Sequence, residues 1–256
     1  MKATFFGTGT SQGVPVIGCK CDVCLSRDLR DKRLRSSILI ETGKRKLLID
    51  AGPDFRQQML RAGISELDAI LLTHEHKDHT GGLDDVRALN YISRRPAEIY
   101  AERRVLNSIR AEYPYAFVDN PYPGAPKMNL NAITGETHFT AGDVEIIPIR
   151  AFHHILPVLG FRIEGLVYIT DANRIERPEM KKMLGCKVLI INALRREKHL
   201  SHFSLSQALN VAGEIGAEHT YLTHISHQMG LHESAERELP ENVRFAYDCL
   251  TLEFTE

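Results

Sequence analysis

One ten-residue segment limits what this chain can fold into more than any other feature. Residues 73–82 read THEHKDHTGG and come directly after the apolar run at 69–72, which predicts a buried strand. Three histidines and one aspartate lie within six positions of this segment. Imidazole and carboxylate side chains at this density are typical ligands of divalent metal ions. The chain therefore has to end a buried strand at a polar site, and we expect that site to bind metal.

The order of these side chains favours two metal ions. If the chain turns from strand to helix here, His74 and His76 face one ion. Asp78 and His79 then face a second ion next to it. The alternative, a solvated polar loop, does not explain why three imidazoles and a carboxylate directly follow a buried strand. One short loop is thus expected to supply half of a dinuclear centre.

Short β-rich runs alternate with helical patterns from end to end, which predicts a layered α/β protein with sheets inside and helices outside. Strands are expected at 3–6, 36–41, 46–50, 69–73, 97–100, 144–149, 158–163, 166–170, 187–192, 219–223, 243–246 and 249–254. Helices are expected at 54–63, 84–94, 103–111, 177–184 and 204–215. In the first helix we expect Asp54 at the N-cap and one apolar face made by Phe55, Met59 and Leu60. Ser204 is expected to cap the last helix.

Two parts of the sequence resemble each other. Residues 36–52 read SSILIETGKRKLLIDAG and residues 159–173 read LGFRIEGLVYITDAN. Both predict a strand, a tight turn and a second strand that ends in Asp-Ala. A duplicated architecture would place Asp50 and Asp171 at related positions at the ends of two packed sheets. Coincidence between two ordinary hairpins stays open as the alternative.

The composition is that of a globular protein: 43% of the 256 residues are hydrophobic and 25% are charged. No Gly/Ser-rich linker divides the chain, so we expect one domain over residues 1–256. The segment 112–136 is expected to be irregular, because it holds four of the 11 prolines and three tyrosines. It is interpreted as a lid or an interface, or else as a tolerated insertion.

Charge and hydropathy limit the partners. Lys and Arg number 32 against 33 Asp and Glu, which gives a formal net charge of −1 and no general attraction for polyanions. Nucleic acid is therefore allowed as a partner but not favoured. The N-terminal MKATFFGTGT has too short an apolar stretch for a signal peptide, and the apolar runs elsewhere are strand-sized. We expect a cytoplasmic protein with no membrane partner.

Three of the five cysteines crowd into residues 18–24, GCKCDVC. Cys19, Cys21 and Cys24 are too close together for a disulfide framework, and their spacing suits a metal ion better. Cys186 and Cys249 lie in apolar, strand-like runs and are expected to be buried small hydrophobic residues. The sequence thus predicts a second metal-binding segment near the N-terminus.

The HEHKDH at 74–79 resembles the HxHxDH signature of the metallo-β-lactamase-fold hydrolases. The resemblance implies a four-layer αββα sandwich that holds two metal ions at one edge of its sheets. It also implies three further ligands. His153 follows a strand and matches the third histidine, with His154 as the fallback. Asp171 matches the bridging aspartate, and His224 matches the last ligand.

The chain also looks like the PhnP-like phosphodiesterases of this superfamily, through the cysteine segment and through LTHISHQ at 222–228. That likeness implies a structural Zn²⁺ held by three thiolates and one imidazole, from Cys19, Cys21, Cys24 and His227. It implies that His202 is a catalytic histidine that binds no metal and donates a proton. A homodimer is a weaker implication. His199, close to His202, is expected to be an ordinary surface or core histidine.

The predicted function is that of a metal-dependent phosphodiesterase, which hydrolyses a small or cyclic phosphodiester through a hydroxide shared by two ions. Mn²⁺ or Zn²⁺ is expected, and Fe²⁺ is compatible with the same ligands. The resemblance assigns one ion to His74, His76 and His153. It assigns the second to Asp78, His79 and His224, with Asp171 between the two ions.

Two residues are singled out as catalytic, Asp78 as a ligand and His202 as the acid. Asp50 and Thr73 are expected to orient the ligand imidazoles. Two alternatives stay open. One is a tRNase Z-like RNA 3′-processing endonuclease, and the other is a non-catalytic binding protein stabilised by zinc.

Overall fold

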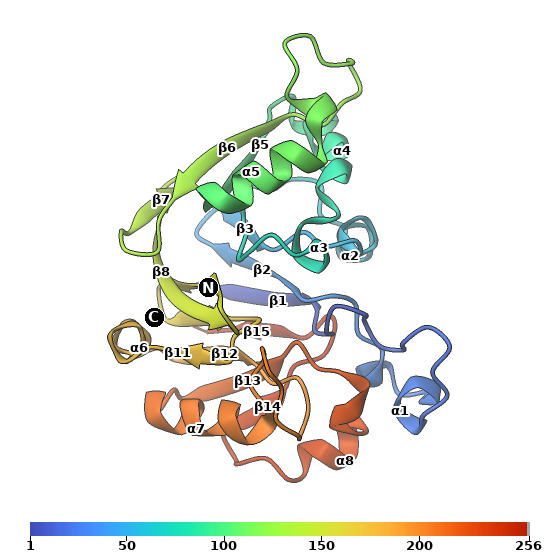
Figure 1. The fold of residues 1–256 in the computed structure, drawn as a ribbon, viewed down its shortest axis with the longest axis vertical. Helices are drawn as coiled ribbons and strands as arrows, with labels where there is room; N and C mark the ends of the chain where they lie inside the picture. The colour runs from blue at the N-terminus through green and yellow to red at the C-terminus, as the bar shows by residue number, and fades with distance from the viewer. Residues whose placement is uncertain (255–256) are drawn as a thin grey trace.

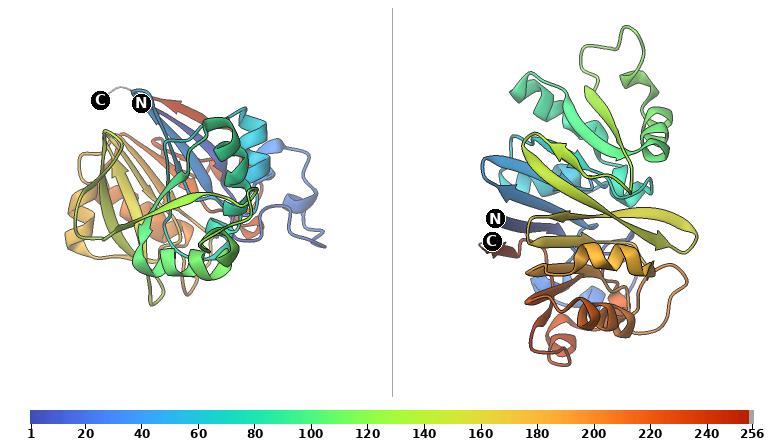
Figure 2. Two further views of the ribbon diagram at one scale, coloured as in Figure 1. Left: turned by 90° about the horizontal axis from the view of Figure 1, so that it is seen from above. Right: turned by 90° about the vertical axis from the view of Figure 1, so that its left-hand side faces the viewer.

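The computed structural model describes residues 1–254, and two β-sheets pack face to face at its centre. Helices cover the outer face of each sheet, as Figures 1 and 2 show. The strand order is β15-β1-β2-β3-β4-β5-β6 in the first sheet and β11-β8-β9-β10-β12-β13-β14 in the second, and β7 pairs with β8. The predicted four-layer αββα class is confirmed.

The strands and helices have the following bounds. The first sheet contains β1 (Lys2–Gly7), β2 (Ser37–Thr42), β3 (Arg45–Ile49), β4 (Ala69–Leu71), β5 (Ala97–Glu102), β6 (Met128–Ile133) and β15 (Thr251–Glu253). The second contains β7 (Phe139–Ala141), β8 (Val144–His153), β9 (Leu156–Ile163), β10 (Leu166–Ile169), β11 (Arg174–Ile175), β12 (Val188–Asn192), β13 (His219–Thr223) and β14 (Val243–Phe245). The α-helices are α1 (Asp22–Leu25), α2 (Phe55–Ala62), α3 (Lys77–Thr80), α4 (Val86–Ser93), α5 (Arg103–Glu112), α6 (Arg177–Met183), α7 (Leu205–Ile215) and α8 (His232–Glu236). Short 3-10 turns are η1 (Leu29–Asp31), η2 (Leu83–Asp85), η3 (Pro114–Ala116) and η4 (His227–Met229).

Three apolar layers separate these elements. In β2, Ile38 and Ile40 point into the core between the sheets, and Leu39 points into the core under α2, α4 and α5. In β10, Tyr168 faces the core between the sheets, and Val167 faces the core under α6, α7 and α8. Strands covered on both faces need apolar residues at consecutive positions, which explains the continuous apolar runs in the sequence.

The two sheets repeat one pattern of pairing. In the first, the antiparallel pair β2–β3 is followed by the parallel strands β4 and β5. In the second, the antiparallel pair β9–β10 is followed by the parallel strands β12 and β13. Each repeated hairpin ends in an aspartate with a left-handed backbone, Asp50 at φ 64° and Asp171 at φ 52°. The internal similarity in the sequence therefore corresponds to two equivalent hairpins.

The prediction of an irregular segment at 112–136 is wrong for residues 128–133. These form β6, which pairs in parallel with β5. β6 ends the strand order of its sheet, so its asparagines tolerate exposure, and two of them donate to the Glu98 carboxylate. Residues 128–131, MNLN, do alternate apolar and polar, but this run is short and lies in a segment rich in proline and tyrosine. The strands β7 and β11 and the helices α1, α3 and α8 were also missed, because two to five residues are too few to show a period.

Three single-residue predictions also differ from the structure. The Asp54 side chain does not cap α2; it accepts from the Arg35 backbone N–H and pairs with the Arg35 guanidinium. Leu60 is exposed, and the buried face of α2 holds Gln58 with Phe55 and Met59. Cys249 is exposed, because it lies at φ 71° in the turn before β15 rather than within a strand.

Within residues 1–254, no helix has both the length and the apolar character that crossing a bilayer requires.

Ser204 caps α7 as predicted, and the cap is a reciprocal one. The Ser204 side chain accepts from the Gln207 N–H, and the Gln207 side chain accepts from the Ser204 N–H. We expect Ser204→Ala to lower the free energy of unfolding by about 0.5 to 2 kcal/mol, as measured by urea denaturation. Ser65→Ala is the control, because Ser65 is exposed and outside the helices. An equal, small effect in both variants would contradict the capping role.

Candidate metal centre

Four strand ends bring the candidate ligands together. The segment 73–79 follows β4, His153 ends β8, Asp171 follows β10 and His224 follows β13. Asp171 and His224 have left-handed backbones, at φ 52° and 54°. Left-handed residues other than glycine carry strain that the surrounding structure must compensate, and such residues concentrate at functional sites. The polar ends of both sheets thus meet at one edge of the sandwich.

Asp50 orients the first part of this cluster. Its side chain is fully buried and accepts from the backbone N–H of Thr73 at 2.9 Å and from the Thr73 hydroxyl. The other side of the carboxylate faces His79, with 2.7 Å between Asp50 Oδ2 and His79 Nδ1. Thr73 also contacts His74 Nδ1 at 2.9 Å. Asp50 and Thr73 therefore hold both imidazoles from behind and leave their Nε2 atoms directed at the centre.

One compact group of ligand atoms contains Asp78, His79, Asp171 and His224, which all lie within 4.8 Å of one another. His79 Nε2 is 3.1 Å from Asp78 Oδ2 and 3.1 Å from Asp171 Oδ2. His224 Nδ1 is 3.1 Å from the same Asp171 oxygen. Two carboxylates and two imidazoles that converge in this way form a donor set suited to a divalent ion.

A second group lies on the other side of Asp171 and contains His153 and His202. The rings of His74 and His76 flank it, with centroids 5.9 Å and 5.1 Å from that of His153. The neighbouring His154 is exposed and has a left-handed backbone. Of the two histidines left open by the sequence, the structure therefore places His153 at the centre.

Buried ring nitrogens in the cluster lack hydrogen-bond partners among the described residues. They are His74 Nε2, His79 Nε2, His153 Nδ1 and His224 Nε2, of which His79 Nε2 has only the two carboxylates nearby. A buried polar atom without a partner normally carries a free-energy penalty of about 1 to 3 kcal/mol, so natural proteins avoid it unless another ligand is bound. The cluster therefore fits divalent metal ions, by its donor types and by its unpartnered nitrogens.

Without a metal, the electrostatics favour the protonation states that metal binding needs at Asp171 and His74, but they favour a protonated ring at His79. Burial acts to raise the pKa of Asp171, but His224 and His79 overcome it and hold the pKa well below its ordinary value. Burial lowers the pKa of His74 well below its ordinary value, so this ring is neutral. Burial also acts to lower the pKa of His79, yet the carboxylates of Asp171, Asp78 and Asp50 raise it well above the usual range. A bound cation would replace the His79 proton as the partner of those charges.

His202 lies against this cluster on the loop between β12 and α7. Its Nε2 is 3.0 Å from Asp171 Oδ1, and its ring stacks on His224 with centroids 4.9 Å apart. The loop is fixed by backbone hydrogen bonds, Phe203 N–H to Ala172 O at 2.7 Å and Leu194 N–H to Phe203 O at 3.0 Å. His202 is thereby held beside Asp171, which follows β10.

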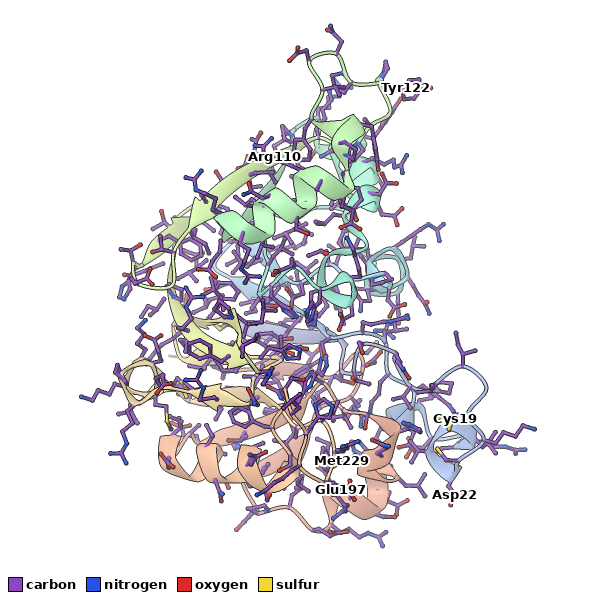
Figure 3. All side chains as sticks on the ribbon, in the orientation of Figure 1. Cys19, Asp22, Arg110, Tyr122, Glu197 and Met229 are labelled. Atoms are coloured by element: carbon purple, nitrogen blue, oxygen red, sulfur yellow. The ribbon has the colours of Figure 1, made fainter. Side chains whose placement is uncertain are left out.

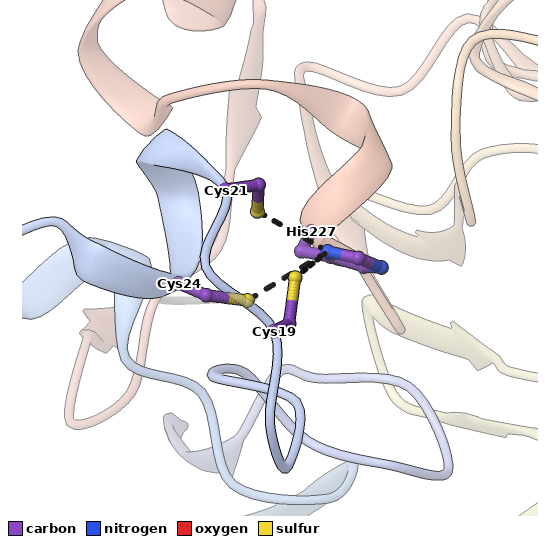
Figure 4. Close-up of side chains that lie close together, drawn as sticks. All are labelled: Cys19, Cys21, Cys24 and His227. Carbon is purple, nitrogen blue, oxygen red and sulfur yellow. Dashed lines mark hydrogen bonds between the residues drawn. The ribbon is translucent and has the colours of Figure 1, made fainter.

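The three clustered cysteines meet His227, as Figure 4 shows. Their sulfur atoms lie 3.3 to 3.6 Å from His227 Nδ1. The cysteines come from residues 19–25, called the α1 segment here because it ends in α1; it projects from one side of the molecule in Figure 3. His227 comes from η4. The backbone N–H of Cys24 and the His227 ring lower the pKa of Cys21 to about 6. Three sulfurs and one imidazole are the donor set of structural zinc sites.

The structure adds two contacts that the sequence did not predict. Ser36 Oγ donates to Gly9 O and lies 3.1 Å from His224 Nδ1, so it orients that ring. His199 Nδ1 lies 3.2 Å from His202 Nδ1. Neither residue belongs to a recognised motif. Only their positions in the sequence could have pointed to them. Ser36 begins the first repeated hairpin unit, and His199 comes three residues before His202.

Comparison with known proteins identifies the family. The β-lactamase superfamily domain matches residues 45–225. The crystal structure of a new diphosphatase from the PhnP family is 35% identical, with a TM-score of 0.92 over 99% of this chain and 98% of that one. The chain belongs to the β-lactamase superfamily and, within it, to the PhnP family. The resemblance drawn from the sequence is confirmed, and so is the class of metal-dependent hydrolases at the level of the family.

Two further relatives of this PhnP-family chain are matched over different shares of their own length. A protein named octanoyltransferase, from Porphyromonas gingivalis strain ATCC BAA-308 / W83, is 45% identical over 253 residues. That match covers 98% of this chain but 51% of the relative, so the chain spans about half of the relative's length. The short form of human tRNase Z is 18% identical with a TM-score of 0.73 over the whole of both chains, which shows a shared fold.

Asp50→Asn tests the orienting role of this carboxylate. We expect the variant to bind Zn²⁺ or Mn²⁺ about 10- to 100-fold more weakly, because a metal-binding imidazole depends on its outer hydrogen-bond partner to that extent. Competition with a chromophoric chelator measures the affinity. Asp68→Asn is the matched control, because Asp68 binds Arg45 and the Lys46 N–H at the opposite end of β4. Equal affinities in the two variants would argue against the role of Asp50.

Proposed function

We propose that this chain is a metal-dependent phosphodiesterase that hydrolyses a small or cyclic phosphodiester at a dinuclear centre. The observation that carries the proposal is the position of His202. Its Nε2 lies 3.0 Å from Asp171 Oδ1 beside the candidate centre, and the side chain is nearly buried. An imidazole at this place is suited to protonate a leaving oxygen. Membership of the PhnP family supports phosphoryl chemistry, since a 35% identical member is a diphosphatase.

The proposed roles follow from the two groups of donors. Asp78, His79 and His224 would hold one ion, and His74, His76 and His153 would hold the other. Asp171 lies with Asp78, His79 and His224 in one group of ligand atoms and with His153 in the other. When bound, Mn²⁺, Zn²⁺ or Fe²⁺ at these positions supplies a water of lowered pKa and positive charge for the phosphoryl oxygens. Asp50 and Thr73 keep the ligand imidazoles in orientation, and His202 gives its Nε2 proton to the leaving oxygen.

A structural Zn²⁺ is proposed for the cluster of Cys19, Cys21, Cys24 and His227. Its role is to attach the projecting α1 segment to η4. Because η4 begins three residues after His224, this attachment also fixes the strand end that carries a ligand of the catalytic centre.

The proposed substrate is small. The net charge of −1 provides no extended positive field for a long polyanion, so nucleic acid is not favoured. The name of the octanoyltransferase relative makes an octanoyl thioester a necessary comparison, although half of that relative lies outside the match. A homodimer stays a prediction.

Purified protein whose bound metal has been quantified should hydrolyse bis(p-nitrophenyl) phosphate much faster than p-nitrophenyl phosphate or an octanoyl thioester. We expect His202→Gln to keep the bound metal and to lower the turnover of a cyclic ribose phosphate, whose alkoxide leaving group needs a proton, by about 10² to 10⁴, the usual contribution of a general acid. Asp78→Ala should lose both metal and activity. Initial rates measured after chelation and metal replacement check these outcomes.

Other results would redirect the assignment. Activity on the thioester alone, or none with the metal fully bound, would contradict the phosphodiesterase proposal. Faster cleavage of a tRNA precursor at its 3′ end would favour the tRNase Z-like alternative. Loss of metal from His202→Gln would show that His202 is a ligand. A dinucleoside diphosphate as the best substrate would move the proposal from a phosphodiester to a diphosphate bond.

Cys24→Ser tests the structural zinc separately. We expect one equivalent of Zn²⁺ fewer by metal analysis, and a melting temperature lower by about 5 °C or more, since each kcal/mol lost shifts it by about 2 to 4 °C. Cys249→Ser is the control, because Cys249 is exposed and outside the cluster. Unchanged zinc content in Cys24→Ser would show that the three thiols do not bind metal.

A further inference from the structure

His202 has a second histidine behind it, on the side away from the metal centre. The two Nδ1 atoms of His199 and His202 are 3.2 Å apart, and the ring centroids are 5.1 Å apart. Ser201 lies between them, with its Oγ 3.1 Å from His202 Nδ1 and 3.3 Å from His199 Nδ1. His199 is half-buried, and His202 is buried. The catalytic imidazole is therefore contacted at both of its nitrogens.

The direction of these hydrogen bonds follows from one backbone group. The Ser201 backbone N–H donates to His199 Nδ1 at 3.3 Å. A backbone N–H can only donate, so His199 Nδ1 carries a lone pair and the proton of this ring is on Nε2. The 3.2 Å contact between the two Nδ1 atoms then requires His202 to donate its Nδ1–H to His199.

We infer that His199 is a positioning residue for the catalytic acid: it accepts the Nδ1–H of His202 and thereby directs His202 Nε2 at the leaving oxygen. This inference rests on the proposed function. Rotation of the imidazole by 180° about its Cβ–Cγ bond would exchange the positions of its nitrogens and carbons. The acceptor at His199 opposes this rotation, because the rotated ring would present a carbon in place of Nδ1.

The proton transfer balances in this arrangement. In the imidazolium form, His202 carries a proton on each nitrogen. As the bond between phosphorus and the leaving oxygen breaks, the Nε2–H bond breaks and a new O–H bond forms on the leaving group. The neutral ring that remains keeps its Nδ1–H on His199. It needs no change of tautomer before water returns a proton to Nε2 for the next turnover.

Ser201 is the competing acceptor, because its hydroxyl is also within 3.1 Å of His202 Nδ1. The hydroxyl is free to rotate, whereas the lone pair on His199 Nδ1 is fixed in the plane of its ring. Replacing Ser201 alone and His199 alone therefore shows which of them accepts the Nδ1–H of His202. Ser201→Ala should leave His202 with its acceptor, and His199→Leu should remove it.

The spectroscopic test uses Zn²⁺-loaded protein labelled with ¹⁵N at histidine. Long-range ¹H–¹⁵N correlation spectra distinguish protonated from unprotonated ring nitrogens, and His202→Gln and His199→Gln assign the two rings. We expect Nδ1 of His202 to be protonated and Nδ1 of His199 to be unprotonated. His199→Leu should leave His202 as a mixture of tautomers. Finding protonated Nδ1 on His199, or an unchanged His202 in His199→Leu, would overturn the inference.

The kinetic test compares two leaving groups. A cyclic ribose phosphate releases an alkoxide, which needs a proton, and bis(p-nitrophenyl) phosphate releases a stable phenolate. We expect His199→Leu to lower kcat for the cyclic substrate by about 10- to 100-fold, the usual effect of removing an imidazole's outer partner, and to change the phenolate reaction little. His199→Gln should restore part of the loss, because its amide oxygen can accept the Nδ1–H.

The control is His219→Leu, because His219 is exposed at the start of β13. Equal losses on both substrates in His199→Leu, or the alkoxide-specific loss in Ser201→Ala instead, would overturn the role of His199 while the phosphodiesterase assignment stands. A wild-type protein that cleaves neither substrate would contradict the proposed function. The spectra would then still decide whether His202 donates to His199.

Discussion

The structure depends on two aspartates that end equivalent hairpins and meet at one imidazole. Asp50 and Asp171 belong to different sheets, yet both lie next to His79, at 2.7 Å and 3.1 Å. Both carboxylates are almost fully buried. Buried charges are unfavourable by several kcal/mol each unless a partner of opposite charge is present. The two sheets can therefore pack at this edge only if a proton or a metal cation occupies the space between their ends.

The two candidate metal sites are connected through the end of β13. His224 and His227 are three residues apart, and the residues between them bind elsewhere. Ile225 exchanges backbone hydrogen bonds with the N-terminal segment at Thr8 and Thr10, and the Ser226 N–H donates to Leu194 O. Leu194 belongs to the loop that carries His202. A structural ion at the cysteines would thus stabilise the same short segment that places the candidate ligand His224.

The residues that the sequence proposed as ligands do lie close together, whereas several strands and helices around them were not predicted. The ligands follow apolar strands, and burial on both faces makes those strands visible as continuous apolar runs, as for Leu39 and Val167. β6 was missed, because its short apolar–polar alternation lies in a segment rich in proline and tyrosine. Asp54 and Leu60 were misassigned because their surroundings are set by residues far away in the sequence. Asp54 forms a salt bridge with Arg35 in place of a helix cap. Leu60 lies on α2 where no neighbouring element of residues 1–254 covers it. His199 was read as ordinary, because its role needs the fold of a loop without periodic structure.

A neutral acceptor behind His202 has a physical advantage over the carboxylate that often supports a catalytic histidine. Burial, together with the nearby His202 and Arg195, lowers the pKa of His199, so its ring is neutral when it accepts the hydrogen bond. A carboxylate there would add negative charge near Asp171, in a site proposed to admit an anionic phosphodiester. It would also stabilise the imidazolium and make its Nε2 proton harder to release. A neutral imidazole fixes the orientation of His202 and leaves its acid strength available for the leaving group.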